Sequence, residues 1–296
     1  MPELPEITAL AGFLDERLAG ATLTQIVLPS AFTLKVADAP YESLVGRTVD
    51  SVGRHGKFLA FNMGAAPQAA NTDEPLSLIV SFAKDGWLKF SDTEPGTETG
   101  STGGYFAAQL GFANNGRDYD ITLTDDGAWK GLALFIVRRP AEVPGIAELG
   151  PDALSPSFGL EEFGRLFTKR QQVKGLLRDQ KLIAGIGNGY SDEILHAAKL
   201  SPVAIASKLE PDAVERLFRT MKELLQGAVT ELSGKGPSEV KPAKKASMRV
   251  HGRTGEPCPV SGDTIRELAF VGTSFQYCPT CQTNGEILAR RGTVKG

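Results

Sequence analysis

The chain has 296 residues, 41% of them hydrophobic, which is enough for two domains that each bury a core. No segment approaches the roughly 20 apolar residues needed to cross a bilayer, and the acidic, proline-broken start is unlike a signal peptide. The formal net charge is −3, but residues 156–296 carry 21 Lys and Arg against 15 Asp and Glu, a net charge of +6; residues 1–155 carry 11 against 20, a net charge of −9. We therefore expect a cytoplasmic protein whose C-terminal half can attract phosphate groups.

The N-terminal half predicts one helix followed by short strands. Pro5 suits a first helical turn, and apolar residues then recur at helical spacing at Ile7, Leu10, Ala11, Leu14 and Leu18. The clearest β-type runs after this helix are residues 22–28, 58–63, 76–82, 87–90, 121–124 and 132–137. Two polar segments, 64–75 and 91–104, predict long flexible loops. Residues 1–150 are therefore expected to form an antiparallel β-sandwich, or a barrel, preceded by a helix.

After Pro151 the pattern becomes helical, with candidate helices at residues 160–167, 173–177, 192–198 and 211–225. We predict a helical domain over 151–232, a Lys/Pro/Gly-rich linker over 233–247 and a small module over 248–285 that holds all three cysteines. The predicted fold class is α+β.

The N-terminus carries the first candidate for chemistry. Methionine is normally removed before a residue as small as proline, so Pro2 is expected to begin the mature chain. A terminal amine has a reference pKa of about 7.7–8.0, so a useful fraction is unprotonated near neutral pH. Such an amine can attack C1′ of a deoxynucleotide, expel the base and leave an iminium. Glu3 can exchange a proton with the sugar ring oxygen, and Glu6 lies one helical turn further on. The alternative is that Pro2 and Glu3 only begin a helix.

A glycine-rich turn in the C-terminal half is the second candidate. Gly185 and Gly187 allow a tight turn whose N–H groups approach an anion. Asn188 can donate its side-chain amide to the same phosphate, and the helix that follows presents its positive end there. The alternative is an ordinary helix–helix turn.

Three segments resemble the formamidopyrimidine-DNA glycosylase / endonuclease VIII family of DNA glycosylases. They are residues 1–7 (MPELPEI), residues 54–59 (RHGKFL) and residues 176–195 (LLRDQKLIAGIGNGYSDEIL). The last is similar to the family's helix–two-turn–helix DNA-binding element, and Leu4 favours the formamidopyrimidine branch. The similarity extends from Met1 to about Gln282.

The resemblance implies a base-excision-repair DNA glycosylase with AP lyase activity that removes oxidised bases. Pro2 then forms a Schiff base with deoxyribose C1′, followed by β(δ)-elimination, and Glu3 is the general acid/base, with Glu6 in the same pocket. Lys57 reaches the phosphate near the lesion. The expected partner is double-stranded DNA with damaged bases or abasic sites, bound by a monomer at the nucleoid and gripped by Gly185, Gly187 and Asn188.

The cysteine module is similar to the family's zinc finger but lacks one ligand. The candidate zinc ligands are Cys258, Cys278 and Cys281. The position expected to hold the fourth cysteine is Ser261, whose neutral hydroxyl is a poor substitute for a thiolate. Asp263 or His251 could complete the shell. The alternative is a metal-free β-hairpin held by Phe270, Phe275 and Tyr277.

The DNA-facing positions also depart from the family pattern. Thr273 stands where the finger carries an arginine, and Arg253 is one residue that could compensate for its charge. A flipped base leaves a gap that needs a filling side chain. Lys84 stands at the family's methionine, and the usual Arg-Arg-Phe wedge is replaced by a segment in which Leu132 or Trp129 could intercalate.

These departures leave two other functions open. One is a non-catalytic damaged-DNA-binding paralogue, which Ser261 and Thr273 favour and the presence of Pro2, Glu3 and Lys57 opposes. The other is a lyase acting mainly on abasic or single-stranded sites, where no lesion must be read and a poor wedge is tolerated.

Overall fold

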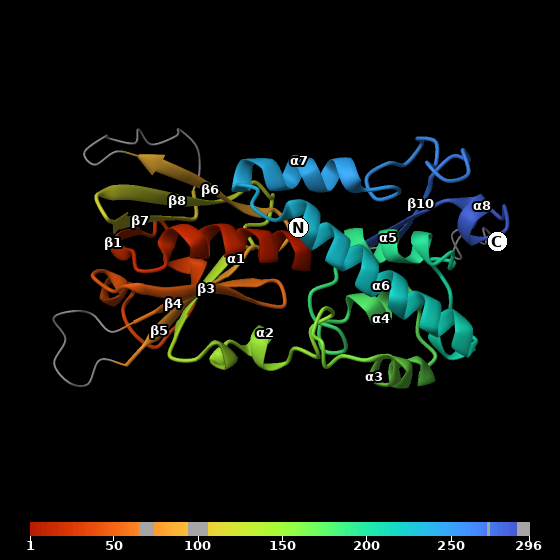
Figure 1. The fold of residues 1–296 in the computed structure, drawn as a ribbon, viewed down its shortest axis with the longest axis horizontal. Helices are drawn as coiled ribbons and strands as arrows, with labels where there is room; N and C mark the ends of the chain where they lie inside the picture. The colour runs from red at the N-terminus through yellow and green to blue at the C-terminus, as the bar shows by residue number, and fades with distance from the viewer. Residues whose placement is uncertain (65–73, 94–105, 271–272, 289–296) are drawn as a thin grey trace, which may run out of the picture. The chain divides into compact units, whose positions relative to one another are not determined.

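The computed structural model describes residues 1–64, 74–93, 106–270 and 273–288, which belong to two compact units (Figure 1). The N-terminal unit comprises Met1–Glu148 and Glu231–Pro242, and the C-terminal unit comprises Leu149–Thr230 and Ala243–Gly296. The predicted α+β class is confirmed, with a leading helix and two sheets in the first unit and mostly helices in the second. No helix in the described residues is both long and apolar enough to cross a membrane.

The N-terminal unit holds two sheets. One has the strand order β1-β7-β8-β6 and the other β2-β9-β5-β4-β3. Their bounds are β1 (Thr22–Val27), β2 (Leu34–Ala37), β3 (Val49–His55), β4 (Phe58–Met63), β5 (Leu76–Ser81), β6 (Gly86–Thr93), β7 (Ala108–Asn114), β8 (Arg117–Asp125) and β9 (Ala133–Val137). All neighbouring strands pair antiparallel except β2 and β9, which are parallel, so the predicted antiparallel sandwich is confirmed with this one exception. Short helical segments are η1 (Ala31–Thr33), η2 (Tyr41–Leu44), η3 (Pro140–Glu142) and α2 (Pro144–Ala147).

Helix α1 (Leu4–Leu18) is fixed to the sheet that contains β3. Its apolar stripe is fully buried at Leu4, Ile7, Leu10, Leu14 and Leu18. A polar contact sets its position, because the Asp15 carboxylate accepts a hydrogen bond from the Val52 N–H of β3 at 2.7 Å. The helix therefore has a fixed position on the sheet, and this position also places its first turn.

The predicted polar loops fall mostly on residues 65–73 and 94–105, which lie outside the described residues. The prediction of a loop is wrong for residues 91–93, which belong to β6 and pair with β8. The sequence pattern did not reveal β2, β3 or β7.

The C-terminal unit is mostly helical. Its elements are α3 (Leu160–Arg165), η4 (Leu166–Thr168), α4 (Val173–Arg178), α5 (Asn188–Ala197), η5 (Ala206–Lys208), β10 (Arg266–Phe270), β11 (Thr273–Tyr277) and α8 (Pro279–Gln282). Helix α6 (Pro211–Leu232) is longer than the prediction of 211–225. Strands β10 and β11 pair antiparallel, as expected for a hairpin in the cysteine module.

The predicted linker over 233–247 is largely a helix, α7 (Pro237–Ser247). Pro237 begins it at a position where its missing N–H costs nothing. Its start belongs to the N-terminal unit, in which the Trp87 indole donates to the Pro237 carbonyl at 3.1 Å and Lys241 Nζ lies 4.6 Å from the Trp87 ring centroid. The Pro/Lys-rich composition that predicted a linker therefore serves a helix with its own packing partner.

Candidate functional site

The first turn of α1 holds the predicted catalytic carboxylates. Pro2, Glu3 and Glu6 are all buried, and Glu3 and Glu6 are only 2% and 1% exposed. Glu3 is the N-cap, its side chain accepts from the Glu6 N–H, and Glu6 Oε2 accepts from the Glu3 N–H at 2.8 Å. This reciprocal capping box fixes both side chains beside Pro2. These residues can therefore begin the helix and still serve as catalytic groups.

Lys57 lies in the two-residue turn between β3 and β4. Gly56 begins the turn with a φ of +55°, which a tight hairpin requires. The Arg54 guanidinium donates to the Gly56 carbonyl at 2.8 Å and to Thr8 Oγ1, on the second turn of α1, at 3.0 Å. The hairpin tip that carries Lys57 is thus fastened near the start of α1. Nothing in the local sequence pattern identifies Arg54 as this positioning residue.

The two predicted gap-filling residues of the wedge segment differ sharply in exposure. Leu132 is buried, with 4% of its surface exposed, and does not present its side chain for intercalation in this structure. Trp129 is 93% exposed. Lys84 is also exposed, in the turn between β5 and β6.

Asp125, at the end of β8, organises the segment that carries Trp129. Its buried carboxylate accepts from the N–H groups of Gly127, Gly131 and Leu132 at 2.9, 2.7 and 2.9 Å. Burial favours the protonated acid, but these N–H donors outweigh it and lower the pKa of Asp125. The closed turn pulls Leu132 inward and leaves Trp129 at its outer edge.

The glycine-rich turn before α5 is built around Gln180. Its side-chain oxygen accepts from the Gly185 N–H at 2.9 Å, and its amide donates to the Arg178 and Ile186 carbonyls at 2.8 and 2.7 Å. Gly185 has a φ of +104°, which strains any other residue. Gly187 is the N-cap of α5 and Asn188 its first residue. Gln180, which lies in the segment 176–195, is therefore a further positioning residue. Its role is not evident from the sequence.

One face of α5 holds the cysteine module. Glu193 accepts from the N–H groups of Arg249, Val250 and His251 at 2.8–2.9 Å. Burial raises the pKa of Glu193, and these donors oppose the rise. The neighbouring Asp192 forms an ion pair with the fully buried Lys174, and its other oxygen lies 2.8 Å from His251 Nδ1.

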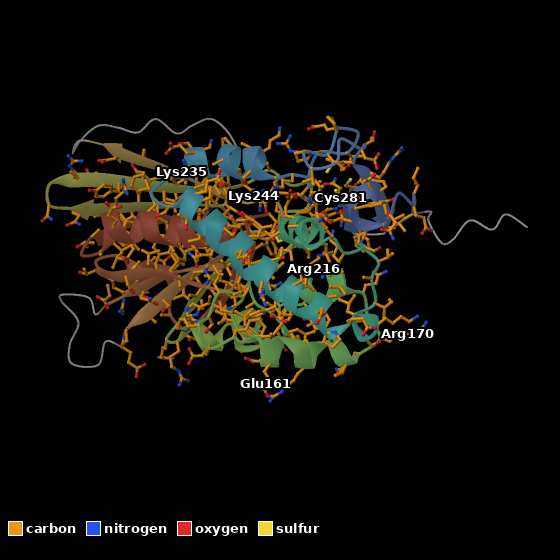
Figure 2. The ribbon with its side chains drawn as sticks, turned by 45° about the vertical axis from the view of Figure 1, so that its right-hand side comes forward. Glu161, Arg170, Arg216, Lys235, Lys244 and Cys281 are labelled. Carbon is orange, nitrogen blue, oxygen red and sulfur yellow. The ribbon has the colours of Figure 1, made fainter. Side chains whose placement is uncertain are left out.

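The cysteine module contains a candidate metal-binding cluster. The ligand atoms of His196, Cys258 and Cys281 all lie within 4.8 Å of one another. Cys278 is buried, with its sulfur 3.1 Å from Ser261 Oγ. Burial raises the pKa of the Cys281 thiol to about 11. His196 was not identifiable from local spacing, because it comes from α5 and not from the module that carries Cys281 (Figure 2).

Other residues considered for the module have different contacts. His251 is held by Asp192, and the Asp263 carboxylate binds the N–H and hydroxyl of Thr280, so neither belongs to the cluster. Arg253 donates to the Met248 and Ala246 carbonyls and to Glu256. Its guanidinium therefore braces the module itself.

The aromatic residues of the hairpin form a separate core. Phe275 and Tyr277 pack with Leu268, apart from the cluster that contains the cysteines. Nothing is described of the side chains at 270 and 273.

Two family models match this chain. The formamidopyrimidine-DNA glycosylase N-terminal domain covers residues 1–119, and the formamidopyrimidine-DNA glycosylase H2TH domain covers residues 149–239. An uncharacterized formamidopyrimidine-DNA glycosylase-like protein of Mycobacterium tuberculosis is 50% identical over 151 residues, which are 51% of this chain and 95% of that protein.

Full-length relatives show the same similarity. The formamidopyrimidine-DNA glycosylase of Pelotomaculum thermopropionicum is 31% identical over 300 residues, covering 95% of this chain and 99% of the relative. The crystal structure of the MutM (Fpg) protein from Thermus thermophilus superposes with a TM-score of 0.74 at 28% identity, covering 95% of this chain and 98% of that one. The chain therefore belongs to the formamidopyrimidine-DNA glycosylase family.

Proposed function

We propose that this chain is a base-excision-repair DNA glycosylase with an associated AP lyase activity, which removes oxidised bases from DNA. The observation that carries the proposal is the buried capping box of Glu3 and Glu6 directly beside Pro2, with the Lys57 hairpin fastened to the same helix by Arg54. The formamidopyrimidine-DNA glycosylases of Pelotomaculum thermopropionicum and Thermus thermophilus, similar over nearly the whole chain, support the same activity.

In the proposed reaction the Pro2 nitrogen bonds to C1′ while the bond from C1′ to the damaged base breaks. The base leaves with that bonding pair and takes up the proton that the Pro2 nitrogen loses. Glu3 gives a proton to the sugar ring oxygen, so the ring opens and an iminium forms between Pro2 and C1′. The iminium accepts electrons when a proton leaves C2′, and the 3′ phosphate is then expelled. Lys57 stabilises the phosphate charge beside the sugar.

Borohydride trapping on an abasic duplex tests this assignment. The chain that begins at Pro2 is expected to give a covalent adduct, because reduction converts the iminium into a stable amine. A variant with extra residues retained before Pro2 is expected to lose an adduct at Pro2, since an amide nitrogen is not a nucleophile. Pro2→Gly is the matched control, because it keeps a free terminal amine. Peptide mapping that places the adduct on a lysine in the native protein contradicts the proposal and favours another nucleophile.

We assign the turn over Gly185, Gly187 and Asn188 to binding a DNA phosphate. The support is the Gln180 scaffold, which holds the backbone of the turn in one conformation at the positive end of α5. Lys84 adds an exposed positive charge in the N-terminal unit.

We further assign the filling of the base gap to Trp129. The Trp129 indole is exposed, and its turn is fixed by three hydrogen bonds to Asp125. It can therefore stack on bases without a prior rearrangement. Trp129→Ala is expected to lower excision from duplex DNA by about 5- to 150-fold, the value of roughly 1–3 kcal/mol for stacking on one base.

The matched control is Trp129→Phe, which keeps a stacking surface and is expected to retain most of the activity. Cleavage of a single-stranded abasic oligonucleotide, where no gap forms, is expected to stay within a few-fold in both variants. Equal losses of Trp129→Ala on duplex and single-stranded substrates contradict the wedge role.

We also propose a structural zinc ion in the cysteine module, with Cys258, Cys278 and Cys281 as ligands. The support is the clustering of the Cys258 and Cys281 thiols with the His196 imidazole, with Cys278 buried beside Cys258, a donor set that suits zinc. The ion would tie the turn after Cys258 to α8 and stabilise the hairpin.

A further inference from the structure

His196 stands out among the buried polar side chains of the C-terminal unit. It lies in the last turn of α5 and is only 2% exposed. Its Nε2 is 3.3 Å from Cys258 Sγ, and its Nδ1 has no hydrogen-bond partner among the residues that the structure describes. A buried imidazole whose Nε2 faces a cysteine sulfur is a candidate metal ligand through that nitrogen.

The helix fixes the direction of this imidazole. His196 follows Asp192 by four residues and Glu193 by three, so all three side chains share one face of α5. Asp192 and Glu193 already hold residues 249–251 and β11 of the module by hydrogen bonds. His196 is therefore presented to the cysteines by a braced helix.

Backbone donors and a second thiol surround the sulfur of Cys258. The N–H groups of Val260 and Ser261 donate to the Cys258 sulfur within a turn that Gly262 closes at a φ of +78°. Donors of this kind support a metal-bound thiolate and orient it. Cys281 Sγ lies 3.9 Å from Cys258 Sγ. Cys278 is outside the group formed by His196, Cys258 and Cys281, but it is buried in the same hydrophobic core cluster as Cys258.

Two of the distances between these atoms match edges of a tetrahedral zinc site. With Zn–S of about 2.3 Å and Zn–N of about 2.0–2.1 Å, a tetrahedron has S···S edges of about 3.8 Å and N···S edges of about 3.5 Å. The 3.9 Å between Cys258 and Cys281 and the 3.3 Å between His196 and Cys258 correspond to these edges.

We propose that His196 is the fourth zinc ligand of this chain, together with Cys258, Cys278 and Cys281. This inference rests on the zinc proposed above and concerns how the ligand missing at Ser261 is replaced. The replacement comes from α5, whereas Ser261 stays outside the ligand set and hydrogen-bonds to the Cys278 sulfur at 3.1 Å. The chain thus has a Cys₃His site shared between the helical element and the module.

Metal analysis and cobalt substitution of the full chain test the ligand set. The native protein is expected to bind one zinc ion per chain. Its cobalt form is expected to show the visible bands of a tetrahedral site and charge-transfer absorption from three thiolates. His196→Ala is expected to weaken zinc binding by at least about 100-fold in competition with a chelator, since second-shell changes alone cost 10- to 100-fold.

The double variant His196→Ala/Ser261→Cys decides the case even if the single variant folds poorly. It is expected to regain zinc binding and to show charge-transfer absorption from four thiolates. Asp263→Asn is the matched control, because Asp263 is the carboxylate that could otherwise have been the fourth ligand. This variant is expected to bind zinc as the native chain does. Undiminished zinc affinity and an unchanged cobalt spectrum in His196→Ala overturn the role of His196 alone. A native protein that binds no zinc overturns the metal itself, and neither result affects the trapping test of Pro2.

Discussion

Glu3→Gln is expected to lower the rate of base release by about 10²- to 10⁴-fold, the usual contribution of a general acid or base. The reason is chemical: the amide cannot give a proton to the sugar ring oxygen when the bond to the base breaks. The fold is expected to survive, because the glutamine side-chain oxygen can still accept the Glu6 N–H in the capping box. Single-turnover assays on a duplex with one oxidised base measure the rate.

The same variant is expected to keep much of its reaction with a pre-formed abasic site. There the base is already gone and the sugar is a hemiacetal that opens to the aldehyde by itself, so Pro2 can form the iminium without a proton from Glu3. Glu16→Gln is the matched control, since Glu16 lies on the same helix but its side chain is 75% exposed. Base release by Glu3→Gln within a few-fold of the control contradicts the assigned role of Glu3.

Lys174→Met is expected to lower the free energy of unfolding by about 3–5 kcal/mol, the cost of removing one partner of a buried ion pair. Lys174 is fully buried and pairs with Asp192, and its Nζ also donates to the Ser274 carbonyl at 2.8 Å. Methionine fills a similar volume but leaves the Asp192 carboxylate without its ammonium partner. Urea denaturation followed by circular dichroism measures the loss.

Two further variants separate lost charge pairing from lost packing. Lys169→Met makes the same substitution at an exposed residue and is expected to change stability by less than about 0.5 kcal/mol. Lys174→Met/Asp192→Asn removes both charges and is expected to be more stable than Lys174→Met alone. If the double variant is instead the less stable of the two, the unpaired carboxylate is not the cause of the loss.

Much of the fold could be predicted because its elements carry regular apolar patterns. Strand β4 has the bounds predicted, and β1 and β5 differ from the prediction by one residue at their ends. Strands β3 and β7 were missed because Gly53, Arg54 and His55 in one, and Gly111 and Asn114 in the other, interrupt the alternation that identifies a strand. Their partners in the sheet stabilise them despite the weak local pattern.

The candidate site was predictable where its residues lie close together in the sequence. Pro2, Glu3 and the glycine-rich turn are short motifs whose chemistry can be argued from spacing. His196 was missed because it meets Cys258 across 62 positions, a contact that only the fold creates. The sequence did not separate Leu132 from Trp129 as a gap-filling residue, because the burial of Leu132 accompanies the hydrogen bonds that Asp125 accepts, and nothing in the local composition reveals that turn.

Helix α5 has ten residues, so it is a stiff rod of about 15 Å. Asn188 stands at one tip and His196 near the other, with Asp192 and Glu193 bonded to the module between them. A helix this short bends little, so a displacement of its first turn, which we propose binds a DNA phosphate, also displaces the end that carries His196. Movement at Asn188 and movement at His196 are therefore expected to be coupled through the helix.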